Sequence, residues 1–401
     1  MGIGISDFGF SWNWNKSAIR NPKSQIPNPK DYMSSSTVIL LTGILVAVAC
    51  AMLGTFLVLR KMAMMADAIS HAILPGLVLS YFLANGPNLL AGFFGAALAA
   101  VITVSLVEAL QKTRRVGGES AIGLVFPAMF ALGTFFVSRF FSNVHLDTDA
   151  VLYGNIEFAA QDVLIVGNTS LGPQSLWVMA FLCVMNGLFI SLFYKELKLA
   201  TFDPGLAASL GFSPFLLHYG LMSVTSVTAV GAFTAVGAVL VVALMIVPAT
   251  TAYLLTDKLP VMVGLSIGIG AASAVSGYYL AVALDSSVAG AMASMTGVFF
   301  GLALLFSPGQ GIVARVRRLA EQRAQLAAET LIVHLFNHEN TPQAATESSV
   351  EHLHDELLWS AEQSQRAIRR ASSQGLIRRE ANHLALTPQG RDLARGLAEA
   401  A

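Results

Sequence analysis

Nine separate stretches of about 20 apolar residues constrain the fold of this chain more than any other feature. An α-helix needs about 20 such residues to cross a hydrocarbon core of roughly 30 Å. The stretches lie at 37–59, 62–84, 89–111, 120–141, 174–194, 215–233, 237–256, 259–280 and 286–306. The sequence therefore predicts an all-α polytopic membrane protein with about nine transmembrane helices. The turn within 215–256 is poorly marked, which leaves a short or re-entrant element there as an alternative.

The composition of the chain excludes an ordinary soluble domain. Hydrophobic residues make up 55% of the chain and charged residues 12%, and the mean hydropathy is +0.64. The formal net charge is zero, so no overall charge balance indicates a nucleic acid or an acidic partner. Cys50 and Cys183 both lie in apolar stretches. This favours small buried side chains over a disulfide framework or a thiolate metal cluster.

The basic residues of the connections predict how the helices are oriented in the cell membrane. They fall on alternate connections, at Arg60, Lys61, Lys112, Arg114, Arg115, Lys195, Lys198, Lys258, Arg315, Arg317 and Arg318. Because cytoplasmic loops carry the excess of Lys and Arg, we expect the N-terminus outside and the C-terminus in the cytoplasm. Residues 1–36 lack a long apolar core and predict a loose tail rather than a secretory signal. The four basic side chains of that tail argue against the orientation.

An aspartate and a histidine stand inside the second apolar stretch, where ionisable groups are costly and mark a site. Asp67 and His71 are four residues apart, so a helix places both side chains on one face. Pro75 cannot donate to the carbonyl of His71, so we expect a backbone oxygen without its helical hydrogen bond beside the pair. Carboxylate, imidazole and carbonyl donors together suit a first-row divalent cation. The alternatives are a polar pair bonded to neighbouring helices and a proton relay.

The connection between the fourth and fifth stretches contains a second group of metal-binding residue types. His145, Asp147 and Asp149 alternate along the chain and would lie on one side of an extended segment. This predicts a metal entry point on the outer face. A solvated loop with ordinary turn-forming residues is the alternative.

The connection around residue 205 predicts a short helix with both ends marked. Asp203 suits the N-cap, Pro204 the first helical position and Gly211 the end of the helix. Leu206 and Leu210 are one turn apart, so one apolar stripe could enter a groove on a cytoplasmic partner. An interfacial helix that rests on lipid is the alternative.

Several motifs together carry a resemblance to a known family. They are Leu57–Lys61 running into Asp67–Gly76, Glu119–Phe126, Val144–Asp147 with Gly154–Asn155, Asp203–Pro204 with Leu210–Gly211, and Val241–Ala249. Over about residues 37–308 the chain resembles the permease subunits of ATP-binding-cassette importers for zinc, manganese and iron. The resemblance implies that residues 37–308 form the transmembrane permease domain.

The resemblance also implies a mechanism and a set of partners. A solute-binding protein outside the cell would deliver Mn²⁺, Zn²⁺ or Fe²⁺, and a pair of permeases, identical or sister subunits, would alternate access. Asp67 and His71 match the family's pathway positions, and the metal is cargo rather than a permanently bound cofactor. The element that docks the ATPase is matched by Phe202, Asp203, Pro204, Leu206, Leu210 and Gly211. No Gly-x-x-x-x-Gly-Lys-Ser/Thr phosphate loop occurs in this sequence, so we expect a separate ATPase subunit to hydrolyse the nucleotide.

Residues 312–401 depart from that family and are soluble in character. We expect a helix over 315–338, a polar connector over 341–349 and a second helix near 350–359. Ser360 and Gln363 form a capping-box pattern that opens a third helix. A hairpin over 375–387 and a last helix from Pro388 complete the pattern.

This pattern resembles the winged helix-turn-helix of bacterial metal-responsive repressors, and it implies a cytoplasmic domain. Arg366, Arg369 and Arg370 share one face of the third helix, and Arg378 and Arg379 lie in the wing, as in domains that contact DNA. From Arg315 onward, however, eleven basic residues balance eleven acidic ones, whereas DNA-binding modules are normally positive. A docking or sensing module is the alternative.

Four histidines of the same region could serve a metal sensor. They are His334, His338, His352 and His354, and the first two lie one turn apart in the expected helix. Solvated or packed histidines are the alternative. The whole chain could then be read in two ways: as a transport subunit, or as a membrane-anchored metal-responsive regulator.

Overall fold

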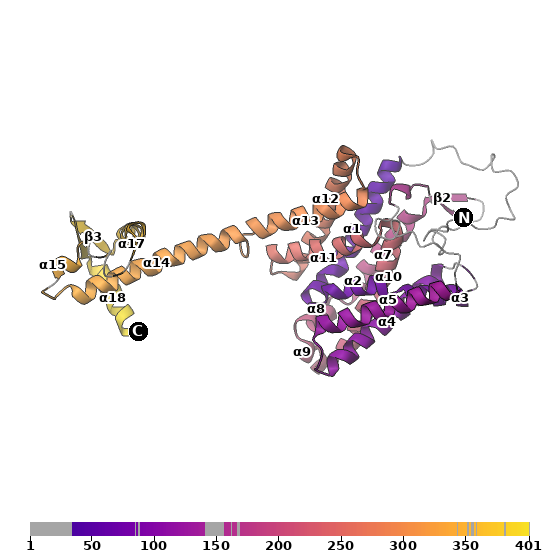
Figure 1. Ribbon diagram of the computed structural model, residues 1–401, viewed down its shortest axis with the longest axis horizontal. Helices are drawn as coiled ribbons and strands as arrows, with labels where there is room; N and C mark the ends of the chain where they lie inside the picture. Colours follow the sequence, from indigo (N-terminus) through magenta and orange to yellow (C-terminus); the bar gives the residue numbers. More distant parts are fainter. Residues whose placement is uncertain are drawn as a thin grey trace. The chain divides into compact units, whose positions relative to one another are not determined.

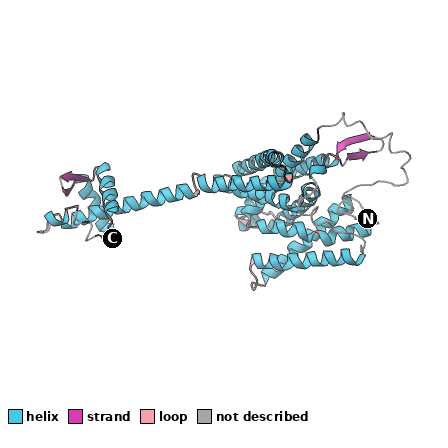
Figure 2. Cartoon of the chain, turned by 45° about the horizontal axis from the view of Figure 1, so that its top comes forward, coloured by secondary structure: helices cyan, strands magenta, loops and turns pink. Residues whose placement is uncertain are grey.

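The computed structural model describes residues 34–84, 86, 89–140, 156–161, 163–166, 169–342, 344–350, 353, 357, 359–380 and 382–400. The chain divides into two compact units, residues 1–304 and 305–401, and each is considered by itself. Helices dominate both units, and the described strands belong to two hairpins (Figure 2).

Eight helices of the described chain are long and apolar enough to cross a membrane, which makes this a multi-pass membrane protein (Figure 1). They are α1 (Ser35–Leu59), α4 (Leu89–Lys112), α5 (Gly118–Phe140), α7 (Gln174–Leu192), α10 (Pro214–Val236), α11 (Ala238–Leu255), α12 (Leu259–Leu284) and α13 (Val288–Phe306). Gly237 separates α10 from α11 at a φ of 82°, a conformation that glycine adopts without strain. Both helices around it are full-length spans, so the short element considered for 215–256 is absent from the described chain.

The stretch at 62–84 was expected to be one membrane span interrupted at Pro75 and Gly76. The interruption is confirmed but falls earlier, and neither half is long enough to be a span by itself. The stretch forms two ten-residue helices, α2 (Ala63–Ala72) and α3 (Leu74–Leu83), which meet at Ile73. Pro75 lies in the first turn of α3, where its missing N–H leaves no helical hydrogen bond unmade. The proline therefore starts a new helix instead of bending an old one, and the break falls immediately after the turn that holds His71.

Helix α1 forms the centre of the membrane unit and packs against α7, α10, α11 and α12. Gly54 lies so close to α11 that a Cβ atom there would be 1.7 Å from the carbonyl oxygen of Met245. Asn186 of α7 donates to the carbonyl of Ala49 over 3.1 Å and accepts from the hydroxyl of Thr228 over 3.0 Å. Small residues and buried hydrogen bonds thus join the helices, as expected where lipid removes the hydrophobic drive for helix association.

A hairpin that sequence reasoning missed precedes α7. It consists of β1 (Val163–Val166) and β2 (Thr169–Pro173), paired antiparallel, in a region expected to be a plain loop. A short 3₁₀ helix, η4 (Ile156–Phe158), comes before it, and the Glu157 carboxylate accepts from the backbone N–H of Val288 over 3.2 Å. This bond ties the connection to the start of α13.

The second unit begins with the long helix α14 (Ile312–His338). After it come α15 (Ala344–Glu347), α17 (Ala361–Ser373), β3 (Ile377–Glu380), β4 (His383–Leu386) and α18 (Pro388–Ala400). The expected capping box at Ser360, the hairpin and the helix opened by Pro388 are confirmed. Most of the helix expected near 350–359 lies outside the described residues.

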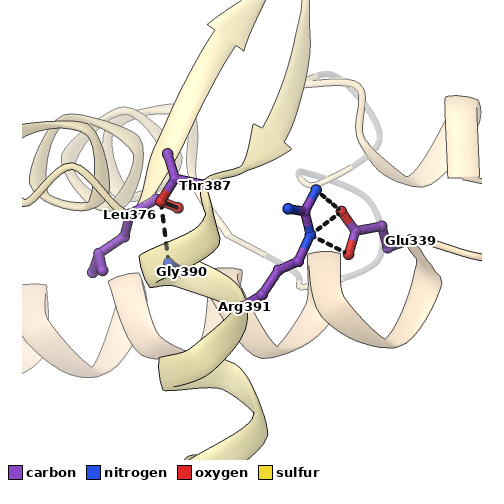
Figure 3. Close-up of polar contacts among 5 residues, drawn as sticks. All are labelled: Glu339, Leu376, Thr387, Gly390 and Arg391. Carbon is purple, nitrogen blue, oxygen red and sulfur yellow. Dashed lines mark hydrogen bonds and ion pairs between the residues drawn. The ribbon is translucent and has the colours of Figure 1, made fainter.

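The core of the second unit joins α14 to the elements that follow it. It contains Ala328, Leu331, Ile332, Leu335, Leu353, Ala367, Ile368, Ala371, Ile377, Leu384, Leu386 and Ala394. Polar contacts cap the start of α18 and join this helix to the end of α14 (Figure 3). The hydroxyl of Thr387 accepts from the N–H of Gly390 over 3.1 Å, and Arg391 Nε donates to both oxygens of Glu339 over 2.8 and 2.9 Å. The hydrogen bond from Arg391 to Glu339 raises the pKa of this arginine.

Candidate functional site

The pair expected to contact metal lies on α2. The helix places Asp67 and His71 one turn apart, although the side chain of Asp67 is outside the description. The imidazole of His71 is half-buried against α5, with its ring centroid 5.4 Å from Phe126 and 6.2 Å, edge-on, from Phe130. Sequence reasoning did not single out these two rings as neighbours of His71. Their spacing of four residues on an apolar helix was the available signal.

The second half of the broken helix is held by a backbone contact. A Cβ atom on Gly76 would lie 2.1 Å from the carbonyl oxygen of Gly95 in α4, and one on Gly95 would lie 2.3 Å from the carbonyl oxygen of Gly76. No larger side chain fits at this crossing. The contact fixes α3 against α4 directly beyond the histidine.

Other metal-binding residue types do not gather in the described part of the chain. No group of three His, Cys, Asp or Glu side chains there could hold a metal ion. Cys50 and Cys183 are both free thiols, and Cys183 Sγ donates to the carbonyl of Leu45 over 3.0 Å. His145, Asp147 and Asp149, expected at a metal entry point, lie outside the described residues.

The short helix expected around residue 205 is confirmed as α9 (Pro204–Ser209), preceded by α8 (Tyr194–Phe202). The Asp203 carboxylate caps α9 by accepting from the N–H of Leu206 over 2.9 Å. Gly211 follows the helix with a φ of 86°, the left-handed conformation that ends many helices. Both ends were predictable because capping depends on residues within one turn.

Apolar side chains on and beside α9 are exposed in the chain by itself. Phe202 is 61% exposed, Leu206 46% and Leu210 60%. Phe212, Phe215 and Leu216 are exposed immediately beyond them, whereas Ala207 is buried and anchors the helix to the membrane unit. We call the six exposed residues the docking surface. Such a cluster is typical of a site for a partner protein.

The five arginines considered for DNA contact all lie on the surface of the second unit. Arg366 pairs with Glu362 one turn earlier in α17, and Arg370 Nε donates to Gln325 of α14 over 3.4 Å. The hydrogen bond from Arg366 holds the pKa of the Glu362 carboxyl below its usual value. Arg369 is exposed on α17, and Arg378 and Arg379 are exposed on β3. Part of the positive charge on α17 is thus already balanced within the chain.

Two of the four candidate sensor histidines lie together at the end of α14. The ring centroids of His334 and His338 are 4.8 Å apart, and His334 is buried. His352 and His354 lie outside the described residues. The four histidines therefore remain a prediction as a group.

These observations define a multi-pass helical membrane protein with an ionisable pair in a broken helix and exposed apolar side chains around α9. Residues 32–307 match the model of the ABC 3 transport family, and the chain belongs to that family.

Curated relatives match both parts of the chain to different extents. The "Zinc transport system membrane protein TroD" of Treponema pallidum is 47% identical over 89% of this chain and 97% of the relative. The "Manganese transport system membrane protein MntD" of Bacillus subtilis is 44% identical over 74% of this chain and 100% of the relative. Residues 1–304 make up about three quarters of the 401 residues, so the match to the treponemal relative must extend into the second unit.

A solved structure shares the fold of the membrane unit. It is "PsaBC from Streptococcus pneumoniae in complex with Fab", with a TM-score of 0.58 and 28% identity. The match covers 70% of this chain and 94% of the solved chain.

Proposed function

We propose that this chain is the permease subunit of an ATP-driven importer for a divalent metal ion. The observation that carries the proposal is the placement of Asp67 and His71 on one face of α2, in a unit that belongs to a transport family. Ionisable residues inside a membrane are expensive, and those that line a path are the ones typically kept. The names of the relatives, which specify zinc and manganese transport, agree with this choice of cargo.

The passing ion is cargo, and Asp67 and His71 supply one oxygen and one nitrogen donor to it. Water and the backbone carbonyl of His71 complete its coordination. The aromatic rings of Phe126 and Phe130 keep the imidazole facing the path. Mn²⁺, Zn²⁺ and Fe²⁺ all accept these donors, so availability and the delivery protein select among them. His145, Asp147 and Asp149 would receive the ion on the outer side.

The energy for transport comes from other polypeptides. A cytoplasmic ATPase binds the docking surface around α9, and Asp203, Pro204 and Gly211 shape the helix that presents it. A solute-binding protein delivers the metal outside the cell, and a second permease, identical or a sister subunit, completes the pathway. This arrangement requires the C-terminus on the cytoplasmic side and the N-terminus outside, as the basic connections predict.

We further propose that residues 312–401 form a winged helix-turn-helix that regulates the transporter. In support, α17 runs directly into the β3–β4 hairpin, and Ser349 forms an isolated bridge with His383 at the edge of that hairpin. Arg366, Arg369, Arg370, Arg378 and Arg379 would be its nucleic-acid contacts. The alternative function, a membrane-anchored regulator that binds DNA, rests on the same helix and hairpin.

The test is ATP-dependent uptake of Mn²⁺, Zn²⁺ and Fe²⁺ in vesicles that carry this permease, its ATPase and its binding protein. We expect Asp67→Ala and His71→Ala each to reduce uptake to background because an ion then loses one of two side-chain donors. Met64→Ala, on an exposed position of the same helix, is the matched control. Full uptake in both site variants, with the complex intact, would contradict the proposed path.

Deleting residues 312–401 separates the two functions. A permease retains uptake without them and loses only its regulation. A regulator shows no uptake in either form, and its DNA binding disappears with the deletion.

A further inference from the structure

A half-buried arginine, Arg60, links the corner between α1 and α2 to the segment that leads into the docking surface. Arg60 caps the C-terminus of α1, and α2 begins three residues later at Ala63. Its Nε donates over 3.0 Å to the hydroxyl of Thr201, which in turn donates over 2.6 Å to the carbonyl of Leu197. Thr201 lies two residues before the cap of α9. One hydrogen bond thus spans 141 positions of sequence to connect the two segments.

The environment of Arg60 makes this bond stronger than a surface contact. The guanidinium is half-buried, and its Nη2 is fully buried without a hydrogen-bond partner among the described residues. Burial lowers the pKa of Arg60. Because one nitrogen of the guanidinium has no hydrogen-bond partner in the described chain, the bond to Thr201 matters more to Arg60. A hydrogen bond from a charged donor is also stronger than one between neutral groups.

A carboxylate of α4, Glu108, contacts the helix that follows α9 in the chain. Glu108 lies in the last turns of α4, and its Oε2 accepts from the hydroxyl of Tyr219 over 3.0 Å. Its Oε1 lies 3.1 Å from Nε2 of His218, within ion-pair distance although the ring is not aligned for a hydrogen bond. His218 is 16% exposed and Glu108 27%. Both partners belong to the first turns of α10, which begins at Pro214.

The two contacts involve the segments on either side of α9. Thr201 lies before this helix in the chain, and His218 and Tyr219 lie after it. In the chain, α8 precedes α9 and α10 follows it, and α9 packs against both helices. Helix α10 also packs against α2 and α4. Apolar contacts allow helices to slide, whereas a directional bond between partly buried groups resists a shift. A displacement of α9 therefore pulls on α1 through Arg60 and on α4 through Glu108.

We propose that Arg60 and Glu108 are positioning residues that couple the docking surface to the metal pair. Arg60 transmits movement of α8 to the α1–α2 corner, and Glu108 transmits movement of α10 to α4. Neither residue touches the ion or the nucleotide. The inference rests on the proposed function, because it requires an ATPase that moves α9.

The experiment measures metal ions transported per ATP hydrolysed by the full complex in vesicles. Thr201→Val removes the acceptor for Arg60 at nearly constant volume, and Glu108→Gln removes the charge that faces His218. We expect each to lower the ratio by about tenfold while ATP hydrolysis continues, a size typical of coupling between contacting groups. The double variant Arg60→Gln with Thr201→Val should be no worse than Thr201→Val alone.

Matched controls separate coupling from folding and from the proposed function itself. Thr250→Val removes a hydroxyl that bonds only to the carbonyl of Ile246 in its own helix, and Thr201→Ser keeps the acceptor, so both should retain the wild-type ratio. An unchanged ratio in Thr201→Val and Glu108→Gln overturns the inference, as does a parallel loss of uptake and hydrolysis. Absence of uptake in the wild type would instead contradict the proposed function.

Discussion

The membrane unit and the second unit of this chain each have a buried apolar core, but they differ in the contacts that accompany it. In the membrane unit, glycines allow backbones to touch, as Gly54 does with Met245, and buried polar groups bond across helices, as Asn186 does. In the second unit, aliphatic side chains fill a core between α14 and its neighbours, while the ion pair of Arg391 with Glu339 is at least partly exposed. In lipid, no hydrophobic effect drives helices together, because the lipid tails are as apolar as the side chains. In water, burial of apolar side chains drives packing. The contacts in each unit of this chain are thus those that its surroundings, lipid or water, favour.

The largest effect expected from this comparison comes from a glycine at a backbone crossing. Gly54→Leu forces a side chain into the carbonyl of Met245, so α1 must separate from α11, at a cost of about 3 kcal/mol or more. We expect little folded protein after extraction in mild detergent, measured by size-exclusion chromatography. Gly264→Leu, where no atom lies within 4 Å of the added Cβ, should give the wild-type profile. Equal yields would mean that the crossing is not needed for assembly.

A smaller effect, confined to one unit, is expected from the core of the second unit. Leu331 is fully buried, and Leu331→Ala should destabilise that unit by about 2–5 kcal/mol. Limited proteolysis of the full chain should then remove the second unit faster, while metal uptake by the membrane unit persists. Leu326→Ala, on an exposed position of the same helix, is the control. Loss of uptake together with proteolytic sensitivity would show that the two units depend on each other.

The smallest effect is expected from a single hydrogen bond inside the membrane unit. Thr228→Val removes the donor to Asn186, and such bonds within membranes contribute about 1 kcal/mol. A decrease of this size should appear as a lower midpoint in detergent-induced unfolding. The control Thr234→Val lies in the same helix and loses only a bond to the carbonyl of Gly231. A decrease well above that of the control would mean that hydrogen bonds between helices stabilise the membrane unit more than expected.

The details that could be predicted from the sequence are those that depend on residues within one turn. Both ends of α9 and the start of α17 were predicted, because the capping residues Asp203, Gly211 and Ser360 act within one turn of themselves. The break in the second stretch was expected from Pro75, but it falls two residues earlier at Ile73, since proline tolerates the first turn of a helix. The hairpin of β1 and β2 was missed because its strands are only four and five residues long.

The sequence by itself determined the class of the protein, the bounds of most spans and the position of Asp67 and His71 one turn apart on a helix. These follow from hydropathy over 20 residues and from helical periodicity, which are local properties of the chain. Only the tertiary structure decided which side chains meet across helices. Phe126 and Phe130 pack against His71, Arg60 donates to Thr201 of α8, and Glu108 accepts from Tyr219 of α10. The partners in these contacts lie more than fifty residues apart. No local pattern specifies which helix faces will meet, because packing of the whole bundle selects them.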